Sequence, residues 1–219
     1  MKKAVCFDCW NTCFYNEIPP PNPYTEFSRR IGKNPLDPSY LRSFKETFML
    51  EKRDMGDSIR IFLDKMGVQY DDTRIKELRQ ILMKFTKNVE AYPETLDVLK
   101  RLRKNGIKSG LVTNCYSQSF EALIQRFPVD GHFDAIVISY DVKALKPDYK
   151  IFEVGLEKLG VKPEKALMVG DNLEEDVRGA ENAGIQGILI DREGKHRSLD
   201  KIEIINSLWE IQKYLSLTF

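Results

Sequence analysis

The first strong pattern in the chain is Lys3-Ala4-Val5-Cys6-Phe7-Asp8, a short apolar run that ends in a carboxylate. A continuous apolar run of this length is typical of a parallel strand buried on both faces. Four similar runs follow, at residues 107–113, 133–139, 166–170 and 187–190. Helical patterns separate the strands, and this alternation indicates βαβ units. The sequence therefore predicts an α/β fold: a Rossmann-like parallel sheet with helices on both faces.

The helices of this predicted core are marked by apolar side chains at helical spacing. Pro93 suits the first position of one helix, and Asp148 suits the N-cap of another. The predicted buried faces are Leu96, Leu99 and Leu102; Phe120, Leu123, Ile124 and Phe127; and Ile151, Phe152, Leu156 and Leu159. A last helix is predicted to carry Ile202, Ile205, Leu208, Trp209 and Leu215.

The interval between the first two strands spans roughly ninety residues, whereas a simple crossover unit needs about thirty. It contains no convincing strand. It does contain four helical faces: Tyr24, Phe27 and Ile31; Leu41, Phe44 and Phe48; Ile59, Phe62, Leu63 and Met66; and Ile75, Leu78, Ile81, Leu82 and Phe85. A proline-rich segment at residues 18–23 cannot form a regular helix and marks its start. We therefore predict a core domain, residues 1–16 and 91–219, and a small all-helical cap domain, residues 17–90.

Composition argues against several classes of function. The 34 basic and 33 acidic residues leave a formal net charge of +1, so no bulk field attracts nucleic acid or an anionic membrane. No apolar run is long enough to span a bilayer, and the one after Met1 is too short for a signal peptide. We expect a cytoplasmic protein with neither nucleic acid nor membrane as partner. No pattern indicates an oligomeric state. The cysteines are expected to be free thiols: Cys6, Cys9, Cys13 and Cys115.

Chemically competent side chains stand where the predicted strands end. Asp8 ends the first strand, Thr113 and Asn114 end the second, and Asp171 follows the fourth. Lys146 comes after the third strand, just before a proline. Ligands of open parallel sheets bind beyond the carboxyl ends of the strands, so these groups are expected to share one edge.

Each of these groups has a plausible chemical role. A carboxylate at a strand tip can act as a nucleophile and form a covalent intermediate. A lysine supplies a fixed positive charge against the nucleophile and the developing anion. A cluster of carboxylates such as Asp8, Asp171 and Asp176 can hold Mg²⁺, a hard cation that prefers oxygen ligands. Taken singly, each residue also fits a turn or a helix cap. Their occurrence in order, each after its own strand, favours a shared site.

The segments that carry these residues resemble the motifs of the haloacid dehalogenase-like hydrolase superfamily. The four matching segments are Phe7-Asp8-Cys9-Trp10-Asn11-Thr12, Leu111-Val112-Thr113-Asn114, Lys146-Pro147-Asp148 and Val169-Gly170-Asp171 through Ala180. The resemblance covers essentially the whole chain, including an all-helical cap inserted after the first motif.

The resemblance implies a role for each matching residue. Asp8 would be the nucleophile, and Lys146 would orient it and neutralise charge. Thr113 and Asn114 would bind the transferring group, with Trp10 at the substrate. Mg²⁺ would be held by Asp8, Asp171, Asp176 and the backbone carbonyl of Trp10. The implied activity is that of a phosphatase on a small phosphorylated metabolite, through an aspartyl-phosphate intermediate.

Trp10 is a departure from the family pattern. Phosphatases of the family usually carry an aspartate there, which protonates the leaving alcohol and later activates water. An indole can do neither. Loss of such help typically slows a reaction by about 10²–10⁴-fold, so slow turnover of alkyl esters is expected.

Two alternatives follow from the same residue. Dehalogenases of the family have an aromatic residue at this position and use no metal, which makes a 2-haloacid dehalogenase one alternative. Asp171, which such enzymes usually replace by serine, and Phe152, where they usually have tyrosine, point the other way. A protein that binds a phosphorylated ligand with little turnover is the other alternative. We favour the phosphatase, because three nearby carboxylates beside one lysine are most simply explained by a bound cation.

Overall fold

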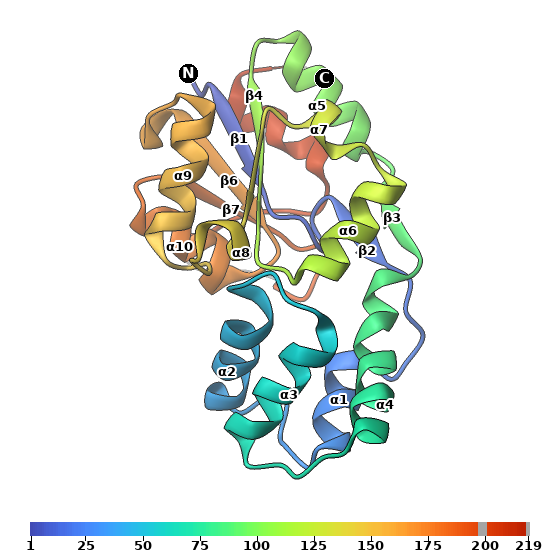
Figure 1. The fold of residues 1–219 in the computed structure, drawn as a ribbon. Helices are drawn as coiled ribbons and strands as arrows, with labels where there is room; N and C mark the ends of the chain where they lie inside the picture. Colours follow the sequence, from blue (N-terminus) through green and yellow to red (C-terminus); the bar gives the residue numbers. More distant parts are fainter. Residues whose placement is uncertain (197–200, 218–219) are drawn as a thin grey trace.

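The computed structural model describes residues 1–196 and 201–217. Within them, six strands form one parallel sheet in the order β5-β4-β1-β6-β7-β8 (Figure 1). The strands are β1 Ala4–Phe7, β4 Lys108–Thr113, β5 Ala135–Ile138, β6 Ala166–Gly170, β7 Gln186–Ile190 and β8 Glu203–Ile205. This sheet, with its flanking helices, confirms the predicted fold class. The order places β1 between β4 and β6, so the ends of these three strands are neighbours.

The core packs on both faces of the sheet because successive side chains of a strand point to opposite sides. Val5 and Phe7 of β1 belong to a cluster on one face that includes side chains of α5 and α6. Ala4 and Cys6 belong to a cluster on the other face, with side chains of α9 and α10. These helices are α5 Thr95–Lys104, α6 Ser117–Arg126, α9 Tyr149–Leu159 and α10 Gly179–Asn182.

Shorter elements complete the core domain. They are α7 Val129–His132, α8 Ser139–Val142, the 3₁₀ segments η2 Pro163–Lys165 and η4 Leu208–Ile211, the π-helical segment η3 Leu173–Arg178, and α11 Gln212–Leu215. No helix among the described residues is long and apolar enough to cross a membrane.

Asp148 caps α9 as predicted, and its carboxylate accepts a hydrogen bond from the backbone N–H of Lys150 at 3.0 Å. Two details of the helix predictions were wrong. Pro93 lies in the turn before α5, which begins two residues later at Thr95. Ile124 is 44% exposed and does not belong to the buried face of α6.

The predicted last helix was wrong over its first half, whereas its second half is helical, as η4 and α11. Glu203–Ile205 forms the edge strand β8, which pairs in parallel with β7 and places Ile205 beside Ile190. Asn206 and Ser207 separate β8 from η4, and the Ser207 side chain caps η4. Three residues are too few to reveal a strand period, so Ile205 fits a helical spacing equally well.

Four helices between β2 and β3 share a separate hydrophobic cluster. They are α1 Pro23–Arg30, α2 Pro38–Met49, α3 Met55–Met66 and α4 Asp72–Leu82, followed by the 3₁₀ turn η1 Met83–Thr86. The aromatic ring of Phe62 lies between 5.4 and 6.0 Å, centroid to centroid, from four other rings: Phe27, Tyr40, Phe44 and Phe48. Leu41, predicted on the buried face of α2, is 42% exposed. Figure 1 shows this helical group beyond the carboxyl ends of the sheet strands.

A small ribbon joins the helical group to the core. β2 Phe14–Asn16 pairs antiparallel with β3 Val89–Ala91. The expectation that the long interval contains no strand was therefore wrong at both its entry and its exit, where three-residue strands give no usable period. β3 crosses the predicted domain boundary at residues 90 and 91, and this boundary remains a prediction.

Because the helical group has its own hydrophobic cluster, substitutions in that cluster should lower the free energy of unfolding. We predict that Phe62→Ala lowers the free energy of unfolding by about 3–5 kcal/mol, because a large buried ring leaves a cavity. Leu41→Ala, on an exposed position of the same group, should change it by less than about 1 kcal/mol. Chemical denaturation of both variants measures this. Equal destabilisation by the two would contradict the packing described.

Candidate active site

A cavity of about 600 Å³ lies where the carboxyl ends of β1, β4 and β6 face the helical group. Core residues Asp8, Asn114 and Lys146 line it on one side. The other side is lined from the segment that enters the helical group, from α1 and α2, and from η1. The position agrees with the rule that ligands of parallel sheets bind at the carboxyl ends of the strands.

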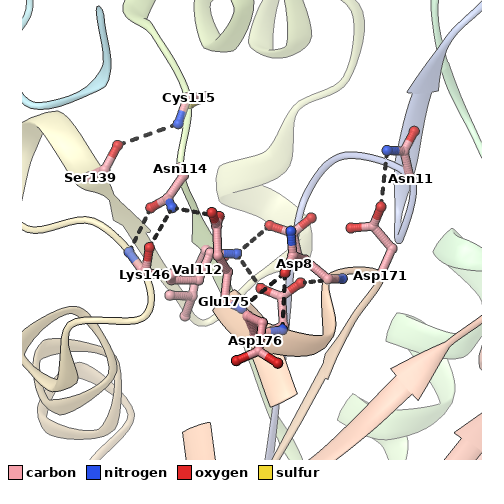
Figure 2. Close-up of polar contacts among 12 residues, drawn as sticks. Asp8, Asn11, Val112, Asn114, Cys115, Ser139, Lys146, Asp171, Glu175 and Asp176 are labelled. Atoms are coloured by element: carbon pink, nitrogen blue, oxygen red, sulfur yellow. Dashed lines mark hydrogen bonds and ion pairs between the residues drawn. The ribbon is translucent and has the colours of Figure 1, made fainter. Parts of the chain in front are cut away.

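Lys146 connects the polar groups at the base of this cavity. Its ammonium donates hydrogen bonds to Asp8 Oδ1 at 2.5 Å, to Asp176 Oδ1 at 2.6 Å and to the backbone carbonyl of Val112 at 3.0 Å. The lysine is only 3% exposed, so all three of its N–H donors find partners away from solvent. Figure 2 shows the lysine and the two carboxylates converging from three separate segments of the chain.

The burial of these charges shifts their protonation equilibria. Burial lowers the pKa of Lys146, but the charges and hydrogen bonds of Asp176 and Asp8 outweigh it and hold this pKa above its ordinary value. Burial raises the pKa of Asp8, Lys146 opposes that shift, and the carboxylates of Asp176 and Asp171 add to it. Burial, followed by the charge of Asp176, also raises the pKa of Asp171. The site thus carries more negative charge than one lysine offsets.

The carboxylates of Asp8, Asp171 and Asp176 fit the needs of a hard divalent cation. One oxygen from each lies within 4.8 Å of the others. Mg²⁺ takes oxygen ligands, and its charge would relieve the repulsion among the three groups. The metal-binding role predicted for these residues remains a prediction, as does that of the Trp10 carbonyl.

Asn114 holds the backbone of Lys146. Its Oδ1 accepts from the Lys146 N–H at 2.9 Å, and its Nδ2 donates to the Lys146 carbonyl at 3.1 Å. The same Nδ2 donates to Glu175 Oε2 at 3.0 Å. The Asn114 side chain lines the cavity, and its contact with the substrate remains a prediction. Thr113 is fully buried at the end of β4 and does not belong to the described cavity lining, so its substrate-binding role rests on the sequence alone.

Gly170 explains how Asp176 reaches the lysine. This glycine ends β6, and a Cβ placed on it would lie 2.2 Å from the Asp176 carboxyl group. The second oxygen of Asp176 accepts from the backbone N–H of Asn172 at 3.0 Å. The glycine therefore leaves the space that the carboxylate occupies at the strand end.

Sequence reasoning assigned no role to Asn11 and Glu175. Asn11 has a φ of 56°, a left-handed conformation that asparagine tolerates better than most residues, and its amide donates to Asp171 Oδ2 at 3.1 Å. Glu175 accepts from Asn114 and forms an ion pair with Lys45 of α2. Asn11 lies beside Trp10 in the first motif, and this position was a weak indication that it belongs to the site. Nothing in the local sequence signals the pairing of Lys45 with Glu175.

Trp10 lines the cavity, and no aspartate stands in its place. Glu175 is another carboxylate of the described lining, outside the Asp8, Asp171 and Asp176 cluster. Both of its oxygens already accept a hydrogen bond, one from Lys45 and one from Asn114. Outside the cluster of Asp8, Asp171 and Asp176, the described lining therefore offers no free carboxylate in place of the aspartate that family phosphatases carry.

Two core side chains also hold the helical group over the site. Ser139 Oγ donates to the Met49 carbonyl at 2.7 Å, and the Tyr116 hydroxyl donates to the Leu82 carbonyl at 3.1 Å. Met49 ends α2 and Leu82 ends α4, where helix carbonyls lack partners within their own helix. These bonds fix the roof of the cavity relative to the sheet.

The thiols at the site are buried. Cys115 lines the cavity, and burial raises its pKa to about 12. Burial likewise raises the pKa of Cys9. A protonated thiol is a weak nucleophile, so neither cysteine side chain is suited to nucleophilic attack.

The close approach at Gly170 yields a test of the metal site. We predict that Gly170→Ala weakens Mg²⁺ binding about 10–100-fold, because the added methyl group displaces Asp176. Gly131→Ala is the matched control, since a Cβ there meets nothing within 4 Å. Calorimetric titration of both variants with Mg²⁺ measures the effect. Unchanged affinity in a folded Gly170→Ala protein would remove Asp176 from the metal site.

Comparison with known proteins places the site in a family context. The chain is 37% identical over 134 residues to a glyceraldehyde 3-phosphate phosphatase of Methanopyrus kandleri, a match that covers 61% of this chain and 52% of that protein. The chain spans about half the length of the curated relatives it matches. The crystal structure of a HAD phosphatase from Thermococcus onnurineus shares 29% identity and a TM-score of 0.64, with 98% of each chain covered.

A second solved structure shows how widely the fold is shared. A 2-haloacid dehalogenase from Pseudomonas syringae has a TM-score of 0.66 at 23% identity, with 99% of each chain covered, and this likeness concerns the fold alone. The sequence profile of the family described as haloacid dehalogenase-like hydrolase matches residues 41–190, more than half of the chain. The chain belongs to the haloacid dehalogenase-like hydrolase family.

Proposed function

We infer that this chain is a magnesium-dependent phosphatase that acts on a small phosphorylated metabolite through an aspartyl-phosphate at Asp8. The observation that carries this inference is the set of three carboxylates, Asp8, Asp171 and Asp176, gathered within 4.8 Å beside one buried lysine. The phosphatase names of relatives such as the Methanopyrus kandleri protein support it.

The reaction has two chemical steps. In the first, a carboxylate oxygen of Asp8 attacks phosphorus, the bond from phosphorus to the ester oxygen breaks, and its electron pair leaves with that oxygen. In the second, water attacks the phosphorus of the aspartyl-phosphate, the bond from phosphorus to the carboxylate oxygen breaks, and inorganic phosphate leaves. The first step needs Asp8 with a free carboxylate oxygen, and the second step returns that oxygen when the bond to phosphorus breaks.

Lys146 prepares Asp8 for the first step. It binds Oδ1, which fixes the carboxylate and leaves Oδ2 as the attacking atom. A magnesium ion bound by Asp8, Asp171, Asp176 and the Trp10 carbonyl would supply positive charge to the phosphoryl oxygens. Because water is scarce around a lysine that is 3% exposed, its charge acts with little screening.

Trp10 limits both steps. It lines the cavity at the position where a family phosphatase carries its acid–base aspartate. With no side chain to protonate the leaving oxygen, esters of aliphatic alcohols should react slowly. The second step also lacks a base for water, so the aspartyl-phosphate should accumulate.

A 2-haloacid dehalogenase is the second candidate, and the aromatic side chain of Trp10 favours it. Such a substrate brings its own carboxylate. Among the described lining residues, Lys146 is the sole cation, and its three donors are committed to other groups. A carboxylate taken into this cavity would lose its hydration without gaining a counter-charge from the described lining, which favours the phosphatase.

A substrate panel separates the candidates, including a protein that binds a phosphorylated ligand with little turnover. We predict release of phosphate from phosphate monoesters with Mg²⁺, none with a chelator, and no halide release from 2-haloacids. Asp8→Asn should abolish the phosphate release, because an amide cannot replace the carboxylate nucleophile. Halide release in the presence of chelator would establish a dehalogenase. Release of neither phosphate nor halide would indicate a protein that binds a phosphorylated ligand with little turnover.

Mg²⁺ should also stabilise the folded chain. A ligand that binds only the folded state raises the melting temperature as its concentration exceeds the Kd. We predict such a rise with millimolar Mg²⁺ and its loss in Asp171→Ala. Asp97→Ala is the control, because this carboxylate lies on α5 and is 62% exposed. A magnesium effect that persists in Asp171→Ala would place the ion elsewhere.

A further inference from the structure

The part of the cavity beyond the polar base is largely apolar and aromatic. Its walls include Trp10, Ile18, Tyr24, Met49, Phe85 and Tyr116. Tyr24 and Phe85 pack against each other with ring centroids 4.4 Å apart, so α1 and η1 present a joined aromatic wall. The volume, about 600 Å³, is ample for a phosphate ester with a ring-sized organic group.

The cationic groups around this wall are already committed. Lys146 is the sole cation of the described lining and donates to Asp8, Asp176 and the Val112 carbonyl. Lys45, which reaches the site from α2, is paired with Glu175. None of the arginines of the helical group belongs to the described lining: Arg29, Arg30, Arg42, Arg53, Arg60, Arg74 and Arg79. A second anionic group on the substrate would be desolvated without a counter-charge.

The polar side chains on the same walls are also partly engaged. The Asn16 amide donates to the carbonyls of Phe85 and Lys87. Asn22 Oδ1 accepts from the N–H of Tyr24, and Ser119 Oγ donates to the Tyr116 carbonyl. The walls therefore offer little to a heavily hydroxylated organic group. They suit an uncharged one with extensive apolar surface.

The absence of an acid–base aspartate at Trp10 is an independent reason to expect an aromatic leaving group. Without a general acid, the leaving oxygen must depart as an anion. A phenol has a pKa of about 10, far below the pKa of an aliphatic alcohol, so a phenolate leaves far more readily. An aromatic leaving group would therefore pack against the aromatic wall of the cavity and could depart without being protonated by the protein.

We propose that the substrate class is a small aryl phosphate monoester whose ring carries no second charge. This proposal rests on the proposed phosphatase function and narrows it. The phosphoryl group faces Asp8 and Lys146, and the ring lies against Trp10, Tyr24 and Phe85. Attack by Asp8 forms the aspartyl-phosphate and releases a phenolate, which takes its proton from solvent.

The test compares kcat/KM for phenyl, 4-carboxyphenyl, benzyl and cyclohexyl phosphates with Mg²⁺. The carboxylate on the ring makes the phenolate a better leaving group, so slower turnover of the 4-carboxyphenyl ester can come only from the cavity. We expect phenyl phosphate to exceed it at least about tenfold, the effect of one unpaired charge. Because kcat/KM reports the first step alone, we expect a lower kcat/KM for benzyl phosphate than for the phenyl ester, and the lowest for cyclohexyl phosphate, which has neither an aromatic ring nor a good leaving group.

Two outcomes overturn the proposal in distinguishable ways. If 4-carboxyphenyl phosphate or phosphoserine matches or exceeds phenyl phosphate, the phosphatase function stands and the substrate class is wrong. If no phosphate ester is hydrolysed, the phosphatase function itself fails.

A variant locates the effect in the cavity. Ile18 is a partly buried wall residue outside both hydrophobic clusters that flank the cavity, so a lysine there brings a cation to the wall. Ile18→Lys should raise the ratio of 4-carboxyphenyl to phenyl turnover about tenfold. Leu41→Lys, which adds the same charge on an exposed position of α2, should leave the ratio unchanged. Equal ratios in the two folded variants would mean that the ring does not lie against this wall.

Discussion

The buried ion pairs of Lys146 with Asp8 and Asp176 are the interaction on which the rest of the structure depends. Burying an ammonium costs several kcal/mol, and that cost is offset only where geometry and hydrogen bonds are good. Here three strands supply the geometry. Asp8 follows β1, the Val112 carbonyl belongs to β4, and Gly170 at the end of β6 leaves room for Asp176. The order of the parallel sheet makes these strand ends neighbours.

The helical group completes the cavity and contributes no charged side chain to its described lining. Its helices have their own aromatic core, and core side chains bind the exposed carbonyls at the ends of α2 and α4. Its one ion pair to the described base of the site, from Lys45, goes to Glu175. The sheet edge therefore contributes the charged groups of the cavity. The helical group contributes mainly apolar and aromatic walls, which limit the substrates that fit.

Much of this arrangement could be predicted from the sequence because it depends on local pattern. The apolar runs identified β1, β4, β5, β6 and β7, and the residues after them include Asp8, Asn114 and Asp171, which line one cavity. The short strands β2, β3 and β8 were missed because three residues carry no readable period. The contacts of Asn11 with Asp171 and of Lys45 with Glu175 join positions 160 and 130 residues apart, which only the folded chain reveals. The two hydrogen bonds between the Asn114 side chain and the Lys146 backbone could likewise not be inferred from the sequence motifs.

The central claim is that Asp8, held by Lys146, takes the phosphoryl group of the substrate. The most direct measurement is to quench the protein during turnover of an aryl phosphate with Mg²⁺ and to map the phosphoryl group by peptide mass spectrometry. The account predicts phosphorylation at Asp8, accumulating because Trp10 provides no base for the water that should remove it. Turnover without any phosphorylated peptide, or with the phosphoryl group on another residue, would contradict the account.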